Sequence, residues 1–289
     1  MFIVRIFELV KMIIMSECFG NNFILNGELQ PAELFNNSLV YEGDSIYEVI
    51  RMVGRVPVFF HDHIERLETS ARLQRRRMLA DSDTLRSEIL ALTKSEKRKE
   101  INMKIVFNYH ESENWLVYLI APVFPTTEQY RKGVKGILFF AERKDPESKV
   151  IDHKLRSEIY HKLVLEGAYE ALLVNKNKCI TEGSRSNIFF IKDETLFTAP
   201  EEVVLSGITR KHLIEICRKK GIDVKFTCIR VDQITEYESV VMTGTSPMVL
   251  PFYCIDNTYF KVNHSFIAYL RNMYLAEAEE SIRRFEKEK

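Results

Sequence analysis

The segment that decides how this chain is interpreted is Thr181-Glu182-Gly183-Ser184-Arg185-Ser186-Asn187-Ile188-Phe189. Taken alone, it predicts a turn at Glu182 and Gly183 that leads into a strand over 188–191. Other unusual segments accompany it in a definite order. They are GDSIYEVIR at 43–51 with HIERL at 63–67, Lys149 ahead of a predicted helix, and LSGITR at 205–210 with TGTS at 243–246. Each has an ordinary structural explanation, but their order and spacing indicate a shared function.

Together these segments resemble the fold-type IV pyridoxal-phosphate enzymes, the group of branched-chain aminotransferases, D-amino-acid aminotransferases and aminodeoxychorismate lyases. The resemblance runs from about Phe23 to about Asp256, and EGSRSN and SGITR are its most specific parts. It implies an α/β fold with some α+β elements, in which a smaller N-terminal and a larger C-terminal domain hold pyridoxal 5'-phosphate at their interface. It also implies a homodimer, because active sites of this family borrow a loop from the partner subunit.

The cofactor needs a lysine that attaches its aldehyde, and two lysines compete for this catalytic role. Counted back from Glu182, Lys149 lies 33 residues away and Lys154 lies 28 residues away. The spacing in the family, matched without a gap, selects Lys149. Lys154 is the alternative, but it would lie one turn into an amphipathic helix, where a solvated lysine is expected.

Glu182 is the expected partner of the pyridine nitrogen, because an adjacent carboxylate keeps that nitrogen protonated. The resemblance also assigns Ser184, Asn187 and Leu205 to the cofactor site, with Leu205 in the position that packs on one face of the ring. Taken separately, these residues would be explained by a turn and by core packing.

The cofactor phosphate is expected at the start of a helix over 209–220. There Gly207 and Ile208 precede Thr209, so free backbone N–H groups and a hydroxyl can meet an anion. Thr209 could also be a plain N-cap. By resemblance, Thr245 is a second phosphate-binding threonine. Arg66 is the phosphate-binding arginine, a contact that suits a guanidinium group, although a solvated arginine is its ordinary alternative.

The resemblance implies transamination between an amino acid and a 2-keto acid, of branched-chain or D-amino-acid type. Tyr47 followed by Glu48 favours the aminotransferases, because the lyase carries a threonine after the aromatic residue. Two alternatives stay open: an aminodeoxychorismate lyase that releases pyruvate and 4-aminobenzoate, and a non-catalytic relative with the same fold.

The residue that binds the substrate carboxylate is not evident from the motifs. Relatives carry an arginine near the end of the third strand, where this chain reads FNYH at 107–110. Arg51 and Arg185 are therefore the candidates, with Tyr47 and Ser246 as further substrate contacts.

Composition excludes several partner classes. The chain has 289 residues, with 41 basic and 41 acidic side chains and no formal net charge, which argues against nucleic-acid and membrane binding. Its longest apolar stretch, 115–124, is much shorter than the roughly 20 residues that span a bilayer. The five cysteines form no CxxC pair, so a reducing, cytoplasmic setting is expected. His61 and His63 lack a third ligand, and no metal is predicted.

Periodicity and turn signals predict an N-terminal domain over 1–125. Asn26-Gly27 predicts a hairpin, followed by strands at 46–52, 56–60, 103–109 and 115–120 and helices at 63–79 and 84–100. Residues 1–14 are a possible extension, because translation could begin at Met15.

Pro122 and Pro125 interrupt this pattern and separate a C-terminal domain over 126–289. Strands are expected there at 134–141, 171–174, 188–191, 195–197 and 240–243. Helices are expected at 152–167, 209–220 and 263–287, with Gly221 ending the second of them.

Overall fold

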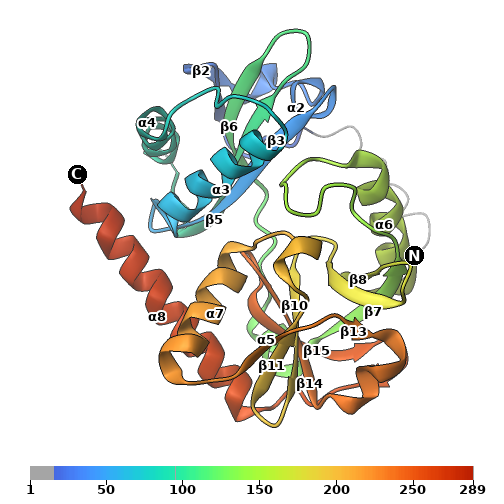
Figure 1. Ribbon diagram of the computed structural model, residues 1–289. Coiled ribbons are helices and arrows are strands. Elements are labelled where there is room, and N and C mark those ends of the chain that lie inside the picture. Colours follow the sequence, from blue (N-terminus) through green and yellow to red (C-terminus); the bar gives the residue numbers. More distant parts are fainter. Residues whose placement is uncertain (1–15, 95, 289) are drawn as a thin grey trace.

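The computed structural model describes residues 16–94 and 96–288, which form a mixed α/β fold built around two sheets (Figure 1). The possible extension over 1–14 and the proposed start at Met15 lie outside the described residues. Among the helices of the described part, none is long and apolar enough to cross a bilayer.

The first sheet has six strands in the order β2-β1-β6-β5-β3-β4, and every neighbouring pair is antiparallel. The strands are β1 (Asn22–Leu25), β2 (Glu28–Pro31), β3 (Ser45–Val53), β4 (Val56–Pro57), β5 (Glu100–Asn108) and β6 (Asn114–Ile120). The predicted hairpin between β1 and β2 is confirmed. Its turn residues Asn26 and Gly27 have φ angles of 52° and 87°, which a two-residue hairpin turn requires.

Helices α3 (Phe60–Leu73) and α4 (Ser82–Thr93) cover one face of this sheet, while η1 (Ala32–Leu34) and α2 (Ser38–Tyr41) lie over the other. Side chains alternate between the two faces along β3. Ile46 and Ile50 therefore pack under α3 and α4, whereas Tyr47 packs in the cluster on the opposite face.

Three expected boundaries in this half are wrong. The strand expected at 56–60 stops at Pro57, and α3 already begins at Phe60. Helix α3 ends at Leu73 rather than 79, because Arg75 adopts a positive φ that a helix cannot contain. Helix α4 ends at Thr93, and Glu100 already belongs to β5.

The chain passes from the first sheet to the second over 121–126, which hold neither helix nor strand, and then through α5 (Thr127–Lys132). The second sheet has ten strands, nine of them in the order β12-β11-β10-β14-β15-β7-β8-β9-β13, with β16 paired to β15. They are β7 (Val134–Phe140), β8 (Glu170–Val174), β9 (Cys179–Gly183), β10 (Asn187–Lys192), β11 (Thr195–Thr198), β12 (Val224–Phe226), β13 (Ile229–Arg230), β14 (Ser239–Gly244), β15 (Met248–Ile255) and β16 (Thr258–Tyr259).

Helices α6 (His153–Glu166), α7 (Ile208–Lys220) and α8 (Ser265–Lys287) pack on this sheet, with η2 (Glu201–Val203) and η3 (Val231–Glu236) in its connections. Gly221 ends α7 with a φ of 69°, as expected. Helix α8 begins against the second sheet and ends beside α3 and α4 (Figure 1). Its Phe266 and Phe285 belong to different core clusters, so the terminal helix joins the two halves.

Candidate active site

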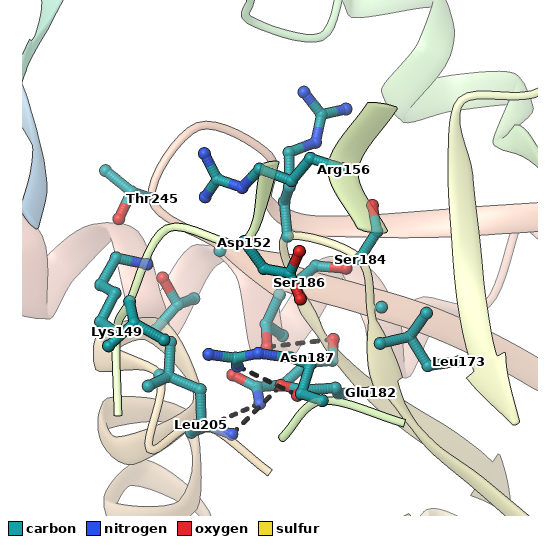
Figure 2. Close-up of a pocket in the computed structure, with 18 of the residues that line it drawn as sticks. Lys149, Asp152, Arg156, Leu173, Glu182, Ser184, Ser186, Asn187, Leu205 and Thr245 are labelled. Atoms are coloured by element: carbon teal, nitrogen blue, oxygen red, sulfur yellow. Dashed lines mark hydrogen bonds and ion pairs between the residues drawn. The ribbon is translucent and has the colours of Figure 1, made fainter. Parts of the chain in front are cut away.

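One pocket is lined by elements from both halves of the molecule (Figure 2). Strand β3 and helix α3 contribute to one side, and the other contributions include the segment before α6, α6 itself, strand β9, the start of α7 and the turn after β14. Twelve of the residues singled out from the sequence line it: Tyr47, Arg66, Lys149, Glu182, Ser184, Arg185, Asn187, Leu205, Gly207, Ile208, Thr209 and Thr245.

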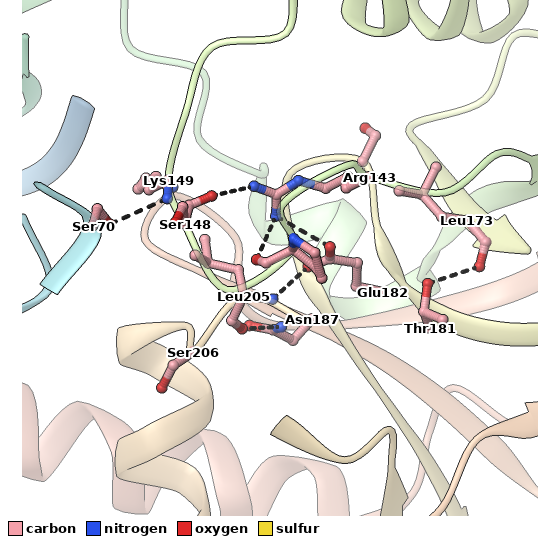
Figure 3. Close-up of polar contacts among 12 residues, drawn as sticks. Ser70, Arg143, Ser148, Lys149, Leu173, Thr181, Glu182, Asn187, Leu205 and Ser206 are labelled. Carbon is pink, nitrogen blue, oxygen red and sulfur yellow. Dashed lines mark hydrogen bonds and ion pairs between the residues drawn. The ribbon is translucent and has the colours of Figure 1, made fainter. Parts of the chain in front are cut away.

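Lys149 reaches the pocket because its segment pairs with the start of β3. The Tyr47 N–H donates to the Lys149 carbonyl at 3.1 Å, and the Ile151 N–H donates to the Ser45 carbonyl at 3.0 Å. The Lys149 N–H donates to Ser70 Oγ of α3 at 3.1 Å (Figure 3). Backbone contacts to both β3 and α3 thus fix the position from which the amine extends.

The Lys149 amine lies 4.7 Å from the centroid of the Tyr47 ring. Burial lowers the pKa of Lys149, with Tyr47 acting against this shift and Arg66 adding to it. A lowered pKa increases the share of the neutral amine, the form that can accept a proton. Lys154, the competing lysine, is exposed on α6 and does not line the pocket.

Glu182 lies at the end of β9 and forms a buried ion pair with Arg143 (Figure 3). Arg143 Nη1 is 3.1 Å from Glu182 Oε1, and the Leu205 N–H donates to Glu182 Oε2 at 3.1 Å. Burial raises the pKa of Glu182, and the positive charge of Arg143 opposes that shift only in part. This carboxylate would therefore be stabilised by a further positive group beside it.

The start of α7 is held close to β10 by Asn187. Its Nδ2 donates to the Leu205 carbonyl at 2.8 Å. A Cβ on Gly207 would lie 2.0 Å from Asn187 Oδ1, so any other residue there would displace the Asn187 side chain. Gly207 is the N-cap of α7 and makes no side-chain capping bond. The first N–H groups of α7 lack partners within the helix, and Gly207, Ile208 and Thr209 at this helix start line the pocket.

Ser184 and Thr209 have hydrogen-bond partners that the sequence did not indicate, and Thr245 lines a second cavity as well as this pocket. Ser184 donates through Oγ to Glu170 Oε1 at 2.5 Å. Thr209 Oγ1 lies 3.2 Å from Tyr274 Oη of α8. Thr245 lies in the turn after β14, and like Thr209 it lines both this pocket and a neighbouring cavity of about 260 Å³.

Arg66 of α3 is held by Glu48 of β3 through two parallel bonds. Arg66 Nε and Nη2 each donate to one oxygen of that carboxylate at 2.7 Å, and His63 Nδ1 is 2.8 Å from Glu48 Oε2. Burial favours the neutral acid, but Arg66 and His63 outweigh it and lower the pKa of Glu48 to about 2. The pair fixes the guanidinium of Arg66 at the pocket edge, where Nη1 also reaches the Ser206 carbonyl at 3.1 Å.

The structure does not bring Arg51 and Ser246 into this pocket. Arg51 follows Tyr47 by four residues on β3, which moves it about 13 Å along the strand. Its guanidinium forms an ion pair with Glu100, donates to the Ser246 carbonyl at 3.1 Å and stacks on Phe124. Arg51 lines the neighbouring cavity instead.

Sequence reasoning missed two arginines of the pocket, Arg143 and Arg156. Arg143 follows β7 and had no motif around it. Arg156 lies near the start of α6, where an arginine is ordinarily solvated. Its position one turn after Asp152, on the helix that directly follows Lys149, is the sequence signal that could have identified it. The Arg156 guanidinium donates to Tyr47 Oη, and its Cζ is 4.7 Å from the Tyr47 ring centroid.

Tyr47 is surrounded by positive charge. Burial raises the pKa of a phenol, but Arg156, Lys149, Arg143 and Lys104 outweigh it and lower the pKa of Tyr47 to about 7. Across the described ranges, no group of three His, Cys, Asp or Glu side chains is placed to hold a metal ion.

Comparison with known families and proteins gives a consistent result. The sequence model of a family described as amino-transferase class IV matches residues 45–253. The D-alanine aminotransferase of Bacillus licheniformis is 23% identical over 227 residues, which cover 74% of this chain and 80% of that protein. A "Probable branched-chain-amino-acid aminotransferase" of Rickettsia bellii (strain RML369-C) is 27% identical over 252 residues, which cover 80% of this chain and 86% of that protein.

Among solved structures, the branched-chain amino acid aminotransferase from the thermophilic archaeon Thermoproteus uzoniensis, with norvaline, superimposes with a TM-score of 0.78. It is 20% identical, and the match covers 91% of this chain and 97% of that one. A further branched-chain amino acid aminotransferase, solved with pyridoxamine 5'-phosphate, is 24% identical and superimposes with a TM-score of 0.79 over 92% of this chain and 96% of its own. This chain therefore shares their fold.

Proposed function

The chain belongs to the class IV aminotransferases, and we propose that it transfers an amino group between an amino acid and a 2-keto acid of branched-chain or D-amino-acid type. Similarity to curated enzymes of both types supports this substrate range. The observation that carries the proposal is one pocket in which Lys149, Glu182 and an anion site at the start of α7 face the same space.

The donor set of the pocket fits pyridoxal 5'-phosphate, the cofactor of this family. Lys149 would hold the aldehyde, and Glu182 would hold the pyridine nitrogen. Arg66, the first N–H groups of α7 and Thr245 would hold the phosphate. Gly207 lets Asn187 pack directly against the start of α7, because a Cβ at this position would collide with the Asn187 side chain.

When bound, the cofactor withdraws electrons from the Cα–H bond of the amino acid. Lys149 Nζ takes up the proton that leaves Cα, and its lowered pKa favours the neutral amine that can accept this proton. Glu182 supplies the negative charge beside the ring nitrogen, and Arg143 keeps that carboxylate oriented. Leu205, whose backbone is bonded to Glu182 and Asn187, would pack on one face of the ring.

A substrate screen tests this proposal against the lyase alternative. The purified protein is incubated with branched-chain L-amino acids and with D-alanine, each with 2-keto acid acceptors, and separately with aminodeoxychorismate. We expect amino transfer in at least one donor–acceptor pair and its loss in the Lys149→Ala variant. Pyruvate release from aminodeoxychorismate, with no transfer in any pair, would assign the lyase activity instead.

The proposal includes a cytoplasmic homodimer. The five cysteines are unpaired thiols, which favours a reducing compartment. Sharing of active-site loops between subunits in this family supports the dimer. Light scattering of the holoenzyme should give twice the chain mass of 33.9 kDa, and a monomeric mass with full activity would contradict the dimer.

A further inference from the structure

We propose that Arg156, together with the hydroxyl of Tyr47, binds the α-carboxylate of the amino-acid substrate. The inference rests on the proposed function and adds a specificity-determining residue to it. The sequence motifs indicated Arg51 and Arg185 for this role, but Arg51 lies outside the pocket and Arg185 is exposed at its edge.

The position of Arg156 relative to Lys149 is the first support. The Arg156 Cζ and the Lys149 Nζ each lie 4.7 Å from the centroid of the Tyr47 ring. The distance between these two atoms is therefore at most twice 4.7 Å. The reacting Cα of an amino acid must lie close to Lys149 Nζ, and its carboxylate is one bond further away. Figure 2 shows Arg156 at the opposite end of the pocket from Glu182 and Leu205, away from the proposed ring site.

The charge balance of the pocket is the second support. Arg66 is paired with Glu48, and Arg143 is paired with Glu182. Arg156 forms no ion pair with any acidic side chain in the described part of the protein, and its bond to Tyr47 leaves most of its N–H groups free. A half-buried guanidinium without a carboxylate partner is well suited to bind one from a ligand.

Lys104 provides an internal comparison. Its amine lies 5.4 Å from the Tyr47 ring centroid, but it is already bound to Glu17 at 2.7 Å and 2.9 Å. Of the two cations, Lys104 and Arg156, that contact the Tyr47 ring besides the proposed catalytic lysine, only Arg156 is open to a substrate.

The hydroxyl of Tyr47 completes a two-point site. Tyr47 Oη accepts a hydrogen bond from Arg156, so its own O–H can donate to a carboxylate oxygen. An incoming carboxylate also adds negative charge beside the phenol, which favours its protonated form. A neutral ligand of the same shape lacks the negative charge that strengthens the bond to Arg156 and favours the protonated phenol.

The test measures binding of an acid and a matched alcohol to the holoenzyme by calorimetry. The probes are 4-methylpentanoate and 4-methylpentan-1-ol, which carry no amino group and cannot react. We expect Arg156→Gln to weaken binding of the acid at least about tenfold, as loss of a charged hydrogen bond does, and to leave the alcohol unchanged. Arg156→Lys should retain part of the preference, and thermal unfolding reports whether each variant is folded.

Two variants serve as comparisons. Lys162→Gln removes one positive charge from an exposed position on the same helix and should leave both affinities unchanged. Arg185→Gln tests the competing arginine, and a selective loss of acid binding in this variant but not in Arg156→Gln would overturn the proposal.

Steady-state kinetics show whether Arg156 binds the α-carboxylate of the amino donor or a carboxylate in the side chain of the donor. Arg156→Gln should raise KM for neutral and acidic amino donors by the same factor, while a rise confined to acidic donors would overturn the assignment. Arg156-dependent acid binding without amino transfer would support this site and refute the proposed function. Amino transfer with unchanged acid binding in Arg156→Gln would refute only this site.

Discussion

The two halves of the molecule each bury a glutamate–arginine pair at the pocket, and the two pairs differ in a way that is instructive. In the N-terminal half, Glu48 receives two bonds from Arg66 and one contact from His63. In the C-terminal half, Glu182 receives a single bond from Arg143 and one from a backbone N–H.

This difference in donors reverses the effect on the carboxyl group. Both carboxylates are almost fully buried, and burial alone raises a carboxyl pKa. At Glu48 the donors outweigh burial and bring the pKa to about 2, whereas at Glu182 burial prevails and the pKa is raised. Glu48 receives all of its positive partners from the protein, whereas Glu182 is left open for a positively charged ligand group.

The largest expected effect concerns Lys149, which lines the same pocket as Arg66 and Glu182. Lys149→Ala should lower the rate of amino transfer by about four orders of magnitude or more, because both the attachment point and the proton acceptor are lost. The visible absorbance of the bound cofactor should change as well. Lys154→Ala is the control. If that variant lost the absorbance and Lys149→Ala kept it, the lysine assignment would be wrong.

Removing the charge of the N-terminal pair should affect stability. Glu48→Gln leaves Arg66 buried without a counterion, and we expect unfolding to become easier by about 3 kcal/mol at neutral pH. The pKa of Glu48 is lowered to about 2, so its contribution is full above the ordinary value of 4.5 and is lost as the pH falls toward 2.

Denaturant unfolding at several pH values measures this effect. The stability difference between wild type and Glu48→Gln should shrink as the pH falls from 4.5 toward 2. A difference that is constant over that range would mean that packing, and not the charge pair, is responsible.

Removing the charge of the C-terminal pair should affect catalysis instead. Glu182→Gln should lower kcat by about 100-fold, the usual effect of losing one electrostatic contact to the reacting system. Because the pKa of Glu182 is raised, its ionisation reduces stability as the pH rises above the ordinary value. The cofactor-free variant should therefore unfold at the same or a higher temperature than wild type at neutral pH. A marked destabilisation like that of Glu48→Gln would remove the contrast between the pairs.

The smallest expected effect is a shift in the ionisation of the Tyr47 phenol. In the cofactor-free protein, Tyr47 should ionise with a pKa of about 7 because of the surrounding cations. Ultraviolet difference spectra of the phenolate should show one of the 12 tyrosines titrating near that pH, and the signal should vanish in Tyr47→Phe. In Arg156→Gln the midpoint should rise, and an unchanged midpoint would show that Arg156 does not contribute to the field at the ring.

Local signals were sufficient for much of the fold. The Asn26-Gly27 turn, the strands at β3, β5 and β6 and the Gly221 helix end depend on neighbouring residues, and sequence periodicity predicted them. Strands β9 and β15 were missed. The first mixes polar and apolar side chains in a short run, and Pro251 interrupts the pattern of the second.

The sequence by itself determined the family and the residue types of the candidate site, because motif order and spacing are properties of the chain. Only the tertiary structure decided which charged side chains lie next to one another in the pocket. The pairing of 149–151 with the start of β3 brings Lys149 to Tyr47, and the packing of α6 brings Arg156 to the same ring. Arg51, although near Tyr47 in the chain, is carried away along β3. Contacts between residues about 100 positions apart depend on how sheets and helices pack, and no local pattern records them.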